Sequence, residues 1–535
     1  EKKSPVPGVV FLLFASAGIA IYPPLSAAVL NEPAEPLPLM EPEDPLLAPV
    51  QPAAPAGAPG PAAPSQPPKT PATETAPDGA IRVPYIPGPV KEQLKKELEE
   101  SLRKEVVEEV MRQGRKEHWG VPDAWPEWVQ RLTFGGDIRL RAQNDDYAAG
   151  NAPAINYLDL QKSNERRSDQ YLNTTEDRDR LRTRLRFGVQ ANVIRNELDA
   201  GFRLATGSSS DPVSTNQTLG STNRPYSIFL DRAFLAWRSR SNVWSAWGGR
   251  MPNPWFSTDL VWDEDLAFDG VALKVNLLRS LTESSPDFDP FLTLGVFPLQ
   301  EVELSQKDKW LYGAQAGFNA RLGGSSKMVF AVAYYDYRNI EGERNTLDSN
   351  LLDHTAPQFV QKGNTMFRID NTTGGTTPLY GLASDFNELN LTASIANYSF
   401  APTHIILTLD YVKNRGFDEQ KIVQRTGGLP LYPFGLDRDV EASQVKLTVG
   451  RPVVERSGEW QASFAYKKIG GNAVLDAFTD SDFHLGGTDA KGWILGGAYG
   501  LALDTWLSVR LISTDEIKGA PLGIDTLQID LNAKF

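Results

Sequence analysis

The chain of 535 residues has no cysteine, only four histidines, and no long apolar run after its first thirty residues. The lack of cysteine excludes disulfides, thiolate metal sites and cysteine nucleophiles. A net charge of −13 argues against nucleic acid as the main partner, because phosphate binding needs a basic domain. No later stretch approaches the roughly 18 apolar residues that a membrane-spanning helix requires. The sequence therefore predicts no helical membrane spans downstream of residue 30.

The first 89 residues have the composition of export and linker segments. Residues 1–28 are typical of a signal peptide, with Lys2 and Lys3 before an apolar run at 9–21 and small residues at 26–28. A signal-anchor helix is the alternative interpretation. Residues 29–89 are rich in proline and alanine and cannot bury enough apolar surface to order themselves. We predict that they form a disordered linker.

Residues 90–114 are predicted to form one amphipathic helix in the periplasm, followed by a connector over 115–130. Pro89 precedes the first turn, and Gly114 follows the last. An apolar stripe recurs every four residues, formed by Leu94, Leu98, Leu102, Val106 and Val110. This spacing drifts around the helix and is not a clean heptad. A coiled coil and a single helix lying against another surface both remain open.

From residue 131 to 535 the apolar period changes from helical to two. Ile138 and Leu140 alternate with Arg139 and Arg141, and about sixteen segments of this kind follow one another. The last ten residues also alternate, up to Phe535, which implies that this final strand is paired on both sides. We therefore predict an all-β, antiparallel barrel of about 16 strands, with 18 as the alternative.

The breaks between these strands alternate long and short along the chain. Outer-membrane barrels have this arrangement, with long loops outside the cell and tight turns in the periplasm. The apolar parity of each strand is expected to face lipid, because an arginine at the membrane midplane costs about 2 to 4 kcal/mol. A barrel of this size also encloses an aqueous channel. Small residues on the other parity favour an open pore: Gly313, Gly317, Ser394 and Ser508.

Charge suggests how such a pore would select solutes. Seven arginines share the predicted lumen parity of three neighbouring strands, and we call them the arginine wall: Arg139, Arg141, Arg180, Arg182, Arg184, Arg186 and Arg203. The third long loop, residues 252–268, carries Asp259, Asp263, Glu264 and Asp265. If this loop folds inward, its carboxylates face the arginine wall across a constriction and create a transverse field. The alternative is that the arginines pair within the wall and the loop is solvated.

Other chemistry has little support in the sequence. The acidic loop lacks the glycine and glutamate positions of an EF-hand, and no histidine has the setting of a catalytic triad. Asp482 and His484 form an acidic-histidine triplet of a kind that is common by chance. We expect no enzymatic activity, no cofactor and no metal site.

Several motifs together resemble a known family. They are Trp119-Gly120, Pro126-Glu-Trp128-Val129, the stretch from Phe134 to Arg141, the alternating arginines from Arg180 to Arg186, Leu230-Asp231-Arg232-Ala233, and Gly249-Arg250-Met-Pro-Asn-Pro254. Over residues 90–535 the chain resembles the putative porin family of diderm bacteria. The resemblance implies a passive outer-membrane channel whose Phe535 is read by the barrel-insertion machinery.

The expected function is that of an outer-membrane porin, a passive diffusion channel for small hydrophilic solutes and ions. A substrate-specific channel and a structural barrel tethered through its N-terminal helix are the alternatives. The expected partners are outer-membrane lipid, lipopolysaccharide, the insertion machinery and small solutes. Association into a homotrimer is left open.

Overall fold

The computed structural model describes residues 128–157, 171–278, 287–303, 305–373 and 378–535. The predicted signal peptide, linker and amphipathic helix lie outside these residues, as does the connector up to residue 127. The described part begins at Trp128 with a short 3-10 helix, η2 (Val129–Arg131), and the first long strand follows at Leu132.

Sixteen long strands form one closed antiparallel barrel. They are β1 (Leu132–Tyr147), β4 (Arg178–Ile194), β5 (Leu198–Thr206), β7 (Ile228–Arg238), β8 (Trp244–Met251), β9 (Phe268–Asn276), β10 (Phe288–Gln300), β11 (Lys309–Arg321), β12 (Ser326–Arg338), β15 (Asn387–Phe400), β16 (Thr403–Asn414), β18 (Glu441–Gly450), β19 (Trp460–Ile469), β20 (Ala490–Ala502), β21 (Thr505–Glu516) and β22 (Gly523–Lys534). A two-residue strand, β6 (Gln217–Thr218), lies beside β4.

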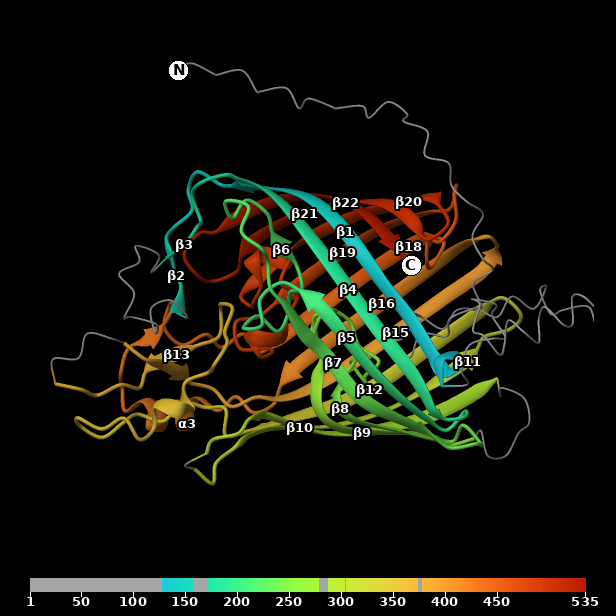
Figure 1. Ribbon diagram of the computed structural model, residues 1–535. Helices are drawn as coiled ribbons and strands as arrows, with labels where there is room; N and C mark the ends of the chain where they lie inside the picture. Colours follow the sequence, from blue (N-terminus) through green and yellow to red (C-terminus); the bar gives the residue numbers. More distant parts are fainter. Residues whose placement is uncertain (1–127, 158–170, 279–286, 304, 374–377) are drawn as a thin grey trace, which may run out of the picture. The chain divides into compact units, whose positions relative to one another are not determined.

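The barrel closes where its first and last strands meet. β1 pairs with β4 along one edge and with β22 along the other, so no edge strand is left open (Figure 1). Arg141 lies opposite Asp530 of β22 and Arg182 of β4. Phe535 continues the seam beyond β22, because its N–H and C=O exchange hydrogen bonds of 3.0 and 2.9 Å with Gly136. The predicted closure and strand number are confirmed.

The connections alternate as the sequence predicted. The long ones are residues 148–177, 207–227, 252–267, 301–308, 339–386, 415–440, 470–489 and 517–522, and we number them as the first to the eighth long loop. The connections at the other end are residues 195–197, 239–243, 277–287, 322–325, 401–402, 451–459 and 503–504. The outer face carries the apolar parity, as in Phe134, Leu140, Leu181, Phe187 and Leu531, which are all exposed. Lipid would cover this surface.

The long loops contain structure that periodicity did not predict. The first loop carries the hairpin β2 (Ala154–Ile155) and β3 (Tyr171–Leu172). The fifth and sixth loops share a small sheet of β13 (Met366–Arg368), β14 (Tyr380–Leu382) and β17 (Leu431–Tyr432), and the sixth also carries helix α3 (Glu419–Thr426). Three further 3-10 turns are η3 (Asp353–Thr355), η4 (Asp476–Phe478) and η5 (Phe483–Leu485). None of the helices in the described residues is both long and apolar enough to cross a membrane.

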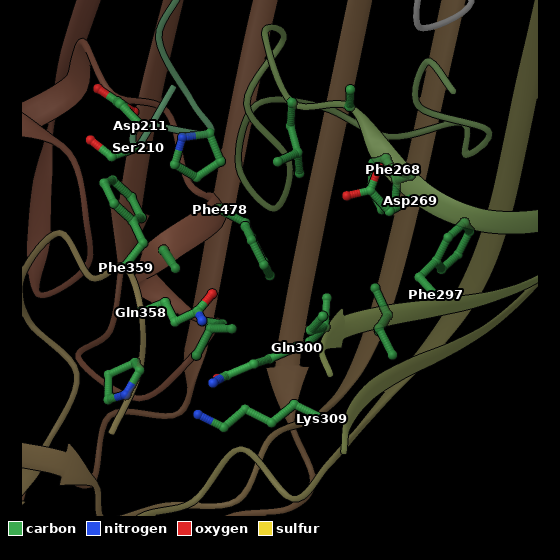
Figure 2. Close-up of a pocket in the computed structure, with 18 of the residues that line it drawn as sticks. Ser210, Asp211, Phe268, Asp269, Phe297, Gln300, Lys309, Gln358, Phe359 and Phe478 are labelled. Atoms are coloured by element: carbon green, nitrogen blue, oxygen red, sulfur yellow. The ribbon is translucent and has the colours of Figure 1, made fainter. Parts of the chain in front are cut away.

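Four long loops, the second, third, fifth and seventh, meet one another and strands β7 to β11 around a cavity of about 510 Å³ (Figure 2). The third loop contributes Trp262 and the residues after it, and the seventh contributes residues 475–478. Loops that merely extended into solvent would leave no such shared cavity. The long loops therefore pack against the barrel and one another.

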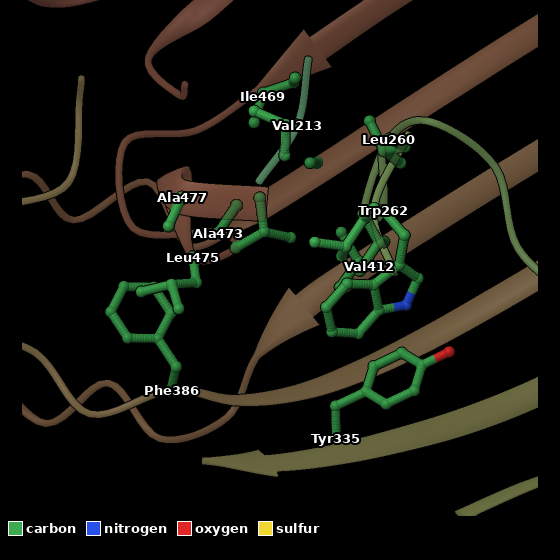
Figure 3. Close-up of a cluster of buried hydrophobic side chains, with 14 of the residues drawn as sticks. Val213, Leu260, Trp262, Tyr335, Phe386, Val412, Ile469, Ala473, Leu475 and Ala477 are labelled. Carbon is green, nitrogen blue, oxygen red and sulfur yellow. The ribbon is translucent and has the colours of Figure 1, made fainter. Parts of the chain in front are cut away.

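A buried apolar cluster holds these loops to the wall (Figure 3). The Trp262 ring packs edge-on against Tyr335 of β12, with 5.1 Å between ring centroids. The Trp255 ring also packs edge-on against Tyr335, with 5.4 Å between ring centroids. Gly313 makes room for Trp255, because a Cβ at Gly313 would lie 2.5 Å from the indole. The prediction that Gly313 marks open pore space was therefore wrong, since an inward-folded aromatic residue fills that space.

Candidate functional site

Most of the arginine wall is neutralised by aspartates on neighbouring strands. Arg184 and Arg186 of β4 both bind Asp137 of β1, at 2.8 and 2.6 Å. The other strand-to-strand pairs are Arg180 with Asp145 at 2.5 Å, Arg203 with Asp231 at 2.5 Å, and Arg141 with Asp530 at 2.7 Å. The register of β1, β4 and β22 brings these groups together, except for Arg203 and Asp231, which meet through the pairing of β5 with β7. Such pairing lowers the electrostatic cost of gathering so many guanidinium groups.

Two arginines of the wall have no carboxylate partner among the described residues. Arg139 donates to the side-chain oxygen of Asn216, and Arg182 donates to Gln143 at 3.3 Å. The Nε atoms of both are buried without a hydrogen-bond partner. Arg139 and Arg182 are therefore the arginines of the wall that form no direct ion pair with a carboxylate of the described residues.

The four carboxylates of the third loop have separate environments. Asp265 lies beside the arginine wall, 3.8 Å from Arg184 and 3.6 Å from Arg186. Asp259 instead binds Lys467 of β19 at 2.8 Å. Asp263 accepts hydrogen bonds from one backbone N–H of the third loop and one of the seventh loop, and Glu264 is exposed. The structure thus brings only Asp265 into direct contact with the predicted arginines.

Local sequence explains why the third loop leaves the strand direction. Proline at positions 252 and 254 removes two N–H donors directly after β8 and prevents the strand from continuing. Asn253 then accepts the N–H of Trp255 at 2.9 Å and turns the chain. Gln315 of β11 holds the next residue, Phe256, through hydrogen bonds of 2.9 and 2.8 Å to its N–H and C=O. The loop is therefore anchored to the wall through its backbone.

The seventh loop supplies charged groups that the sequence did not reveal. Asp482 binds Arg141 at 2.8 Å and Arg510 at 3.2 Å. Asp480 binds Lys467 at 2.8 Å, so this lysine holds the third and seventh loops together. The only local signal was the acidic spacing at 480 and 482, which has no meaning until the loop is placed against β1 and β19.

His484 is buried, and its ring nitrogens contact Thr514 at 2.9 Å and Glu516 at 2.7 Å. Among the described residues, no group of three or more His, Asp or Glu side chains is arranged to hold a metal ion.

Burial and neighbouring charges separate the pKa values of the loop carboxylates. Burial disfavours the ionised form of Asp265, but Arg184 and Arg186 outweigh it and lower the pKa. Lys467 does the same for Asp259 against its own burial. Burial, together with Asp265 and Asp480, raises the pKa of Asp263 well above its usual range. The loops therefore hold neighbouring carboxylates whose pKa values are shifted in opposite directions.

Asp476 makes the packing of the seventh loop sensitive to pH. Burial raises its pKa from 3.8 to about 7, and neither carboxylate oxygen accepts a hydrogen bond of normal geometry from the described residues. The folded protein therefore retains a proton that the unfolded chain loses near pH 4, so stability decreases as the pH rises from about 4 to 7. We expect hydrogen exchange over residues 470–489, corrected for intrinsic rates, to be faster at pH 8 than at pH 5.

Asp476→Asn should reduce this difference, and Asp489, whose pKa is also raised to about 7, should retain part of it. The matched control is Asp287→Asn, which makes the same side-chain substitution at an exposed position. An exchange difference between pH 5 and pH 8 that Asp476→Asn leaves unchanged would refute this role of Asp476.

The closed 16-strand barrel, its lipid-facing apolar parity and its charged interior contacts define the protein as a channel-type barrel of the bacterial outer membrane. A family model described as "Putative porin" matches residues 47–535, and the chain belongs to this family. No curated protein shows significant similarity to the chain.

Solved porin structures resemble the chain at low sequence identity. OprB of Pseudomonas putida at high pH is 10% identical, with a TM-score of 0.44, and the match covers 78% of this chain and 97% of that one. The outer-membrane channel DcaP of Acinetobacter baumannii is 12% identical, with a TM-score of 0.38 and coverage of 76% and 97%. An anion-selective porin from Comamonas acidovorans is 12% identical, with a TM-score of 0.38 and coverage of 76% and 99%.

Proposed function

We propose that the protein is a passive diffusion channel for small hydrophilic solutes and ions, with a preference for anions. The observation that carries the proposal is that two partly buried arginines of the arginine wall take part in no ion pair among the described residues. Among the described residues, Arg139, Arg182 and Lys446 take part in no ion pair, and Lys446 lies close enough to Glu264 to interact with it electrostatically. Glu264 is exposed and is likewise in no ion pair. Arg139 and Arg182 thus place two positive charges without an ion-pair partner on the face that lies beside the third loop.

The third loop is proposed to form the constriction. Its Asp259, Asp265 and Thr258 contact β19, β4 and β16, which are separate parts of the barrel wall. A loop tied to three sides of a closed barrel narrows the passage between them. Charge near such a constriction acts strongly on passing ions because the surrounding walls focus the field. The arginine wall, in this proposal, sorts anions mainly through Arg139 and Arg182.

Reversal potentials in planar bilayers under a salt gradient test this proposal. Arg139→Ala combined with Arg182→Ala should lower the anion-to-cation permeability ratio, whereas Glu264→Gln should raise it. Both shifts should shrink at high salt, because screening shortens the reach of each charge. The matched control is Arg195→Ala with Arg240→Ala, which removes the same charge from exposed turns.

If the Arg139 and Arg182 double variant gives discrete ohmic current steps and the same permeability ratio as the control variant, these two arginines are not the selectivity filter. The protein would still be a diffusion channel. Folded protein that inserts into bilayers and gives no current steps would refute the diffusion channel itself.

A further inference from the structure

The cavity among the second, third, fifth and seventh loops has the size of a ligand site. Its volume of about 510 Å³ lies within the roughly 300 to 1,000 Å³ that small-molecule pockets occupy. Aromatic and aliphatic side chains form much of its wall, including Trp262, Phe268, Phe297, Phe359 and Phe478. Apolar walls with a few placed polar groups are typical of specific binding sites.

Most of the charged groups that line the cavity already have partners. Asp231 binds Arg203 at 2.5 Å, and Asp269 binds Arg250 at 2.9 Å. Asp265 accepts two hydrogen bonds from Thr215, at 3.0 and 2.9 Å. These pairs contribute polarity to the cavity but no uncompensated charge.

Three lining groups, Lys309, Asp211 and Asp476, have no ion-pair partner among the described residues. Burial raises the pKa of Asp476 to about 7, which favours its neutral form and leaves Lys309 and Asp211 as the groups of opposite charge. Lys309 is only 5% exposed, and its Nζ donates to the carbonyl of Ala356 at 2.8 Å and that of Thr355 at 3.5 Å. Asp211 accepts one hydrogen bond, from the N–H of Val213 at 3.1 Å. A buried ammonium without a carboxylate is costly, and a bound anion would compensate it.

The two groups lie on different sides of the cavity. Figure 2 shows Asp211 with Ser210 on one side, and Lys309 with the amide of Gln300 on the other. Phe359 and Phe478 lie between them in this view, and Gln358 is nearer to Lys309. A ligand that meets both charged groups must therefore place its own charges apart, with an apolar segment between them.

We propose that this cavity binds a small zwitterion whose ammonium group meets Asp211, whose carboxylate meets Lys309, and whose apolar body lies against the aromatic walls. A simple anion would leave Asp211 unpaired and a simple cation would leave Lys309 unpaired, so both should bind less well. The proposal adds a solute class to the proposed channel. Binding to folded protein can be measured without any current, so the absence of a zwitterion site is distinguishable from the absence of a diffusion channel.

Isothermal titration calorimetry on the full-length, detergent-solubilised protein provides the test. The probes are the zwitterions 4-aminobutyrate, 6-aminohexanoate and 8-aminooctanoate, with hexanoate and hexylammonium as single-charge analogues. We expect at least one zwitterion to bind about tenfold or more tightly than either analogue, since a hydrogen bond to a charged group is worth about that factor. No binding across the zwitterion series, or equal binding of the analogues, would overturn the proposal.

Two variants assign the ends of the site. Lys309→Met should weaken the zwitterion and hexanoate by about tenfold or more but leave hexylammonium unchanged. Asp211→Asn, which keeps the side-chain shape, should weaken the zwitterion and hexylammonium but not hexanoate. Lys307→Met is the control, because Lys307 is exposed and pairs with Glu343 at 2.7 Å, two residues from Lys309.

Heat-modifiable mobility on gels verifies that each variant is folded. If Lys309→Met does not fold, the affinities of the Asp211→Asn variant decide whether the cavity binds both charges of the zwitterion. Unchanged affinity for the zwitterion in a folded variant of either residue overturns the assignment of that end and with it the two-charge site.

Discussion

Lys467→Met is expected to cause a large rise in single-channel conductance and open-channel noise. The Nζ of Lys467 lies 2.8 Å from Asp259 of the third loop and 2.8 Å from Asp480 of the seventh, and its side chain is 0% exposed. It also lies 5.2 Å from the centre of the Phe483 ring. Removing one partner of a buried ion pair costs about 3 to 5 kcal/mol, because the remaining charge stays buried without compensation. Two carboxylates would be left in that position.

The loops can avoid this cost by moving out of the interior, and the barrel strands stay paired. We therefore expect a wider and noisier channel rather than an unfolded one, and heat-modifiable gel mobility should remain normal. The control is Lys468→Met, the next residue, whose half-exposed side chain binds Asp439 at 3.1 Å. Conductance and noise equal to those of the control would show that Lys467 does not hold the loops.

Arg141→Leu is expected to be the most destabilising change in the arginine wall. Arg141 is 2% exposed and binds Asp530 of β22 at 2.7 and 2.9 Å and Asp482 of the seventh loop at 2.8 and 3.1 Å. Leucine leaves Asp530 buried without its ion-pair partner, at the seam where the barrel closes. We expect the free energy of unfolding in lipid vesicles to fall by about 3 to 5 kcal/mol, measured by urea titration with tryptophan fluorescence.

The same substitution should also shift the permeability ratio toward cations, because Asp482 loses the cation that binds it at 2.8 Å and keeps Arg510 at 3.2 Å. Arg195→Leu in an exposed turn is the matched control and should change the free energy of unfolding by less than about 0.5 kcal/mol. An equal effect of the two substitutions would argue that Arg141 is solvated rather than buried between the strand and the loop.

The barrel itself was predictable because lipid acts on every strand in the same way. Each strand must place apolar side chains on one face, so Ile138 and Leu140, or Ile529 and Leu531, follow a period of two. All backbone groups must also be paired in the membrane, which requires closure. These constraints repeat along the chain, so strand number and the alternation of loop lengths could be read from local patterns alone.

The pairing within the arginine wall was only half visible in the sequence. Parity placed the seven arginines on one face, but the partners of Arg184 and Arg186 depend on the register between β1 and β4, which puts Asp137 opposite Arg186. The sequence left open whether these arginines were paired within the wall. The structure shows that most of them are, and that Arg139 and Arg182 differ from the rest.

The sequence by itself therefore determined the closed barrel and the alternation of its two faces, because both follow from short-range alternation. Only the tertiary structure decided which charged and aromatic side chains contact one another inside the barrel. Arg141 and Asp482 are 341 residues apart, and Asp259, Lys467 and Asp480 come from two loops and a strand. Loop residues face both water and protein, so no periodic rule constrains them. Their partners are settled by packing around Trp255 and Trp262 against the barrel wall.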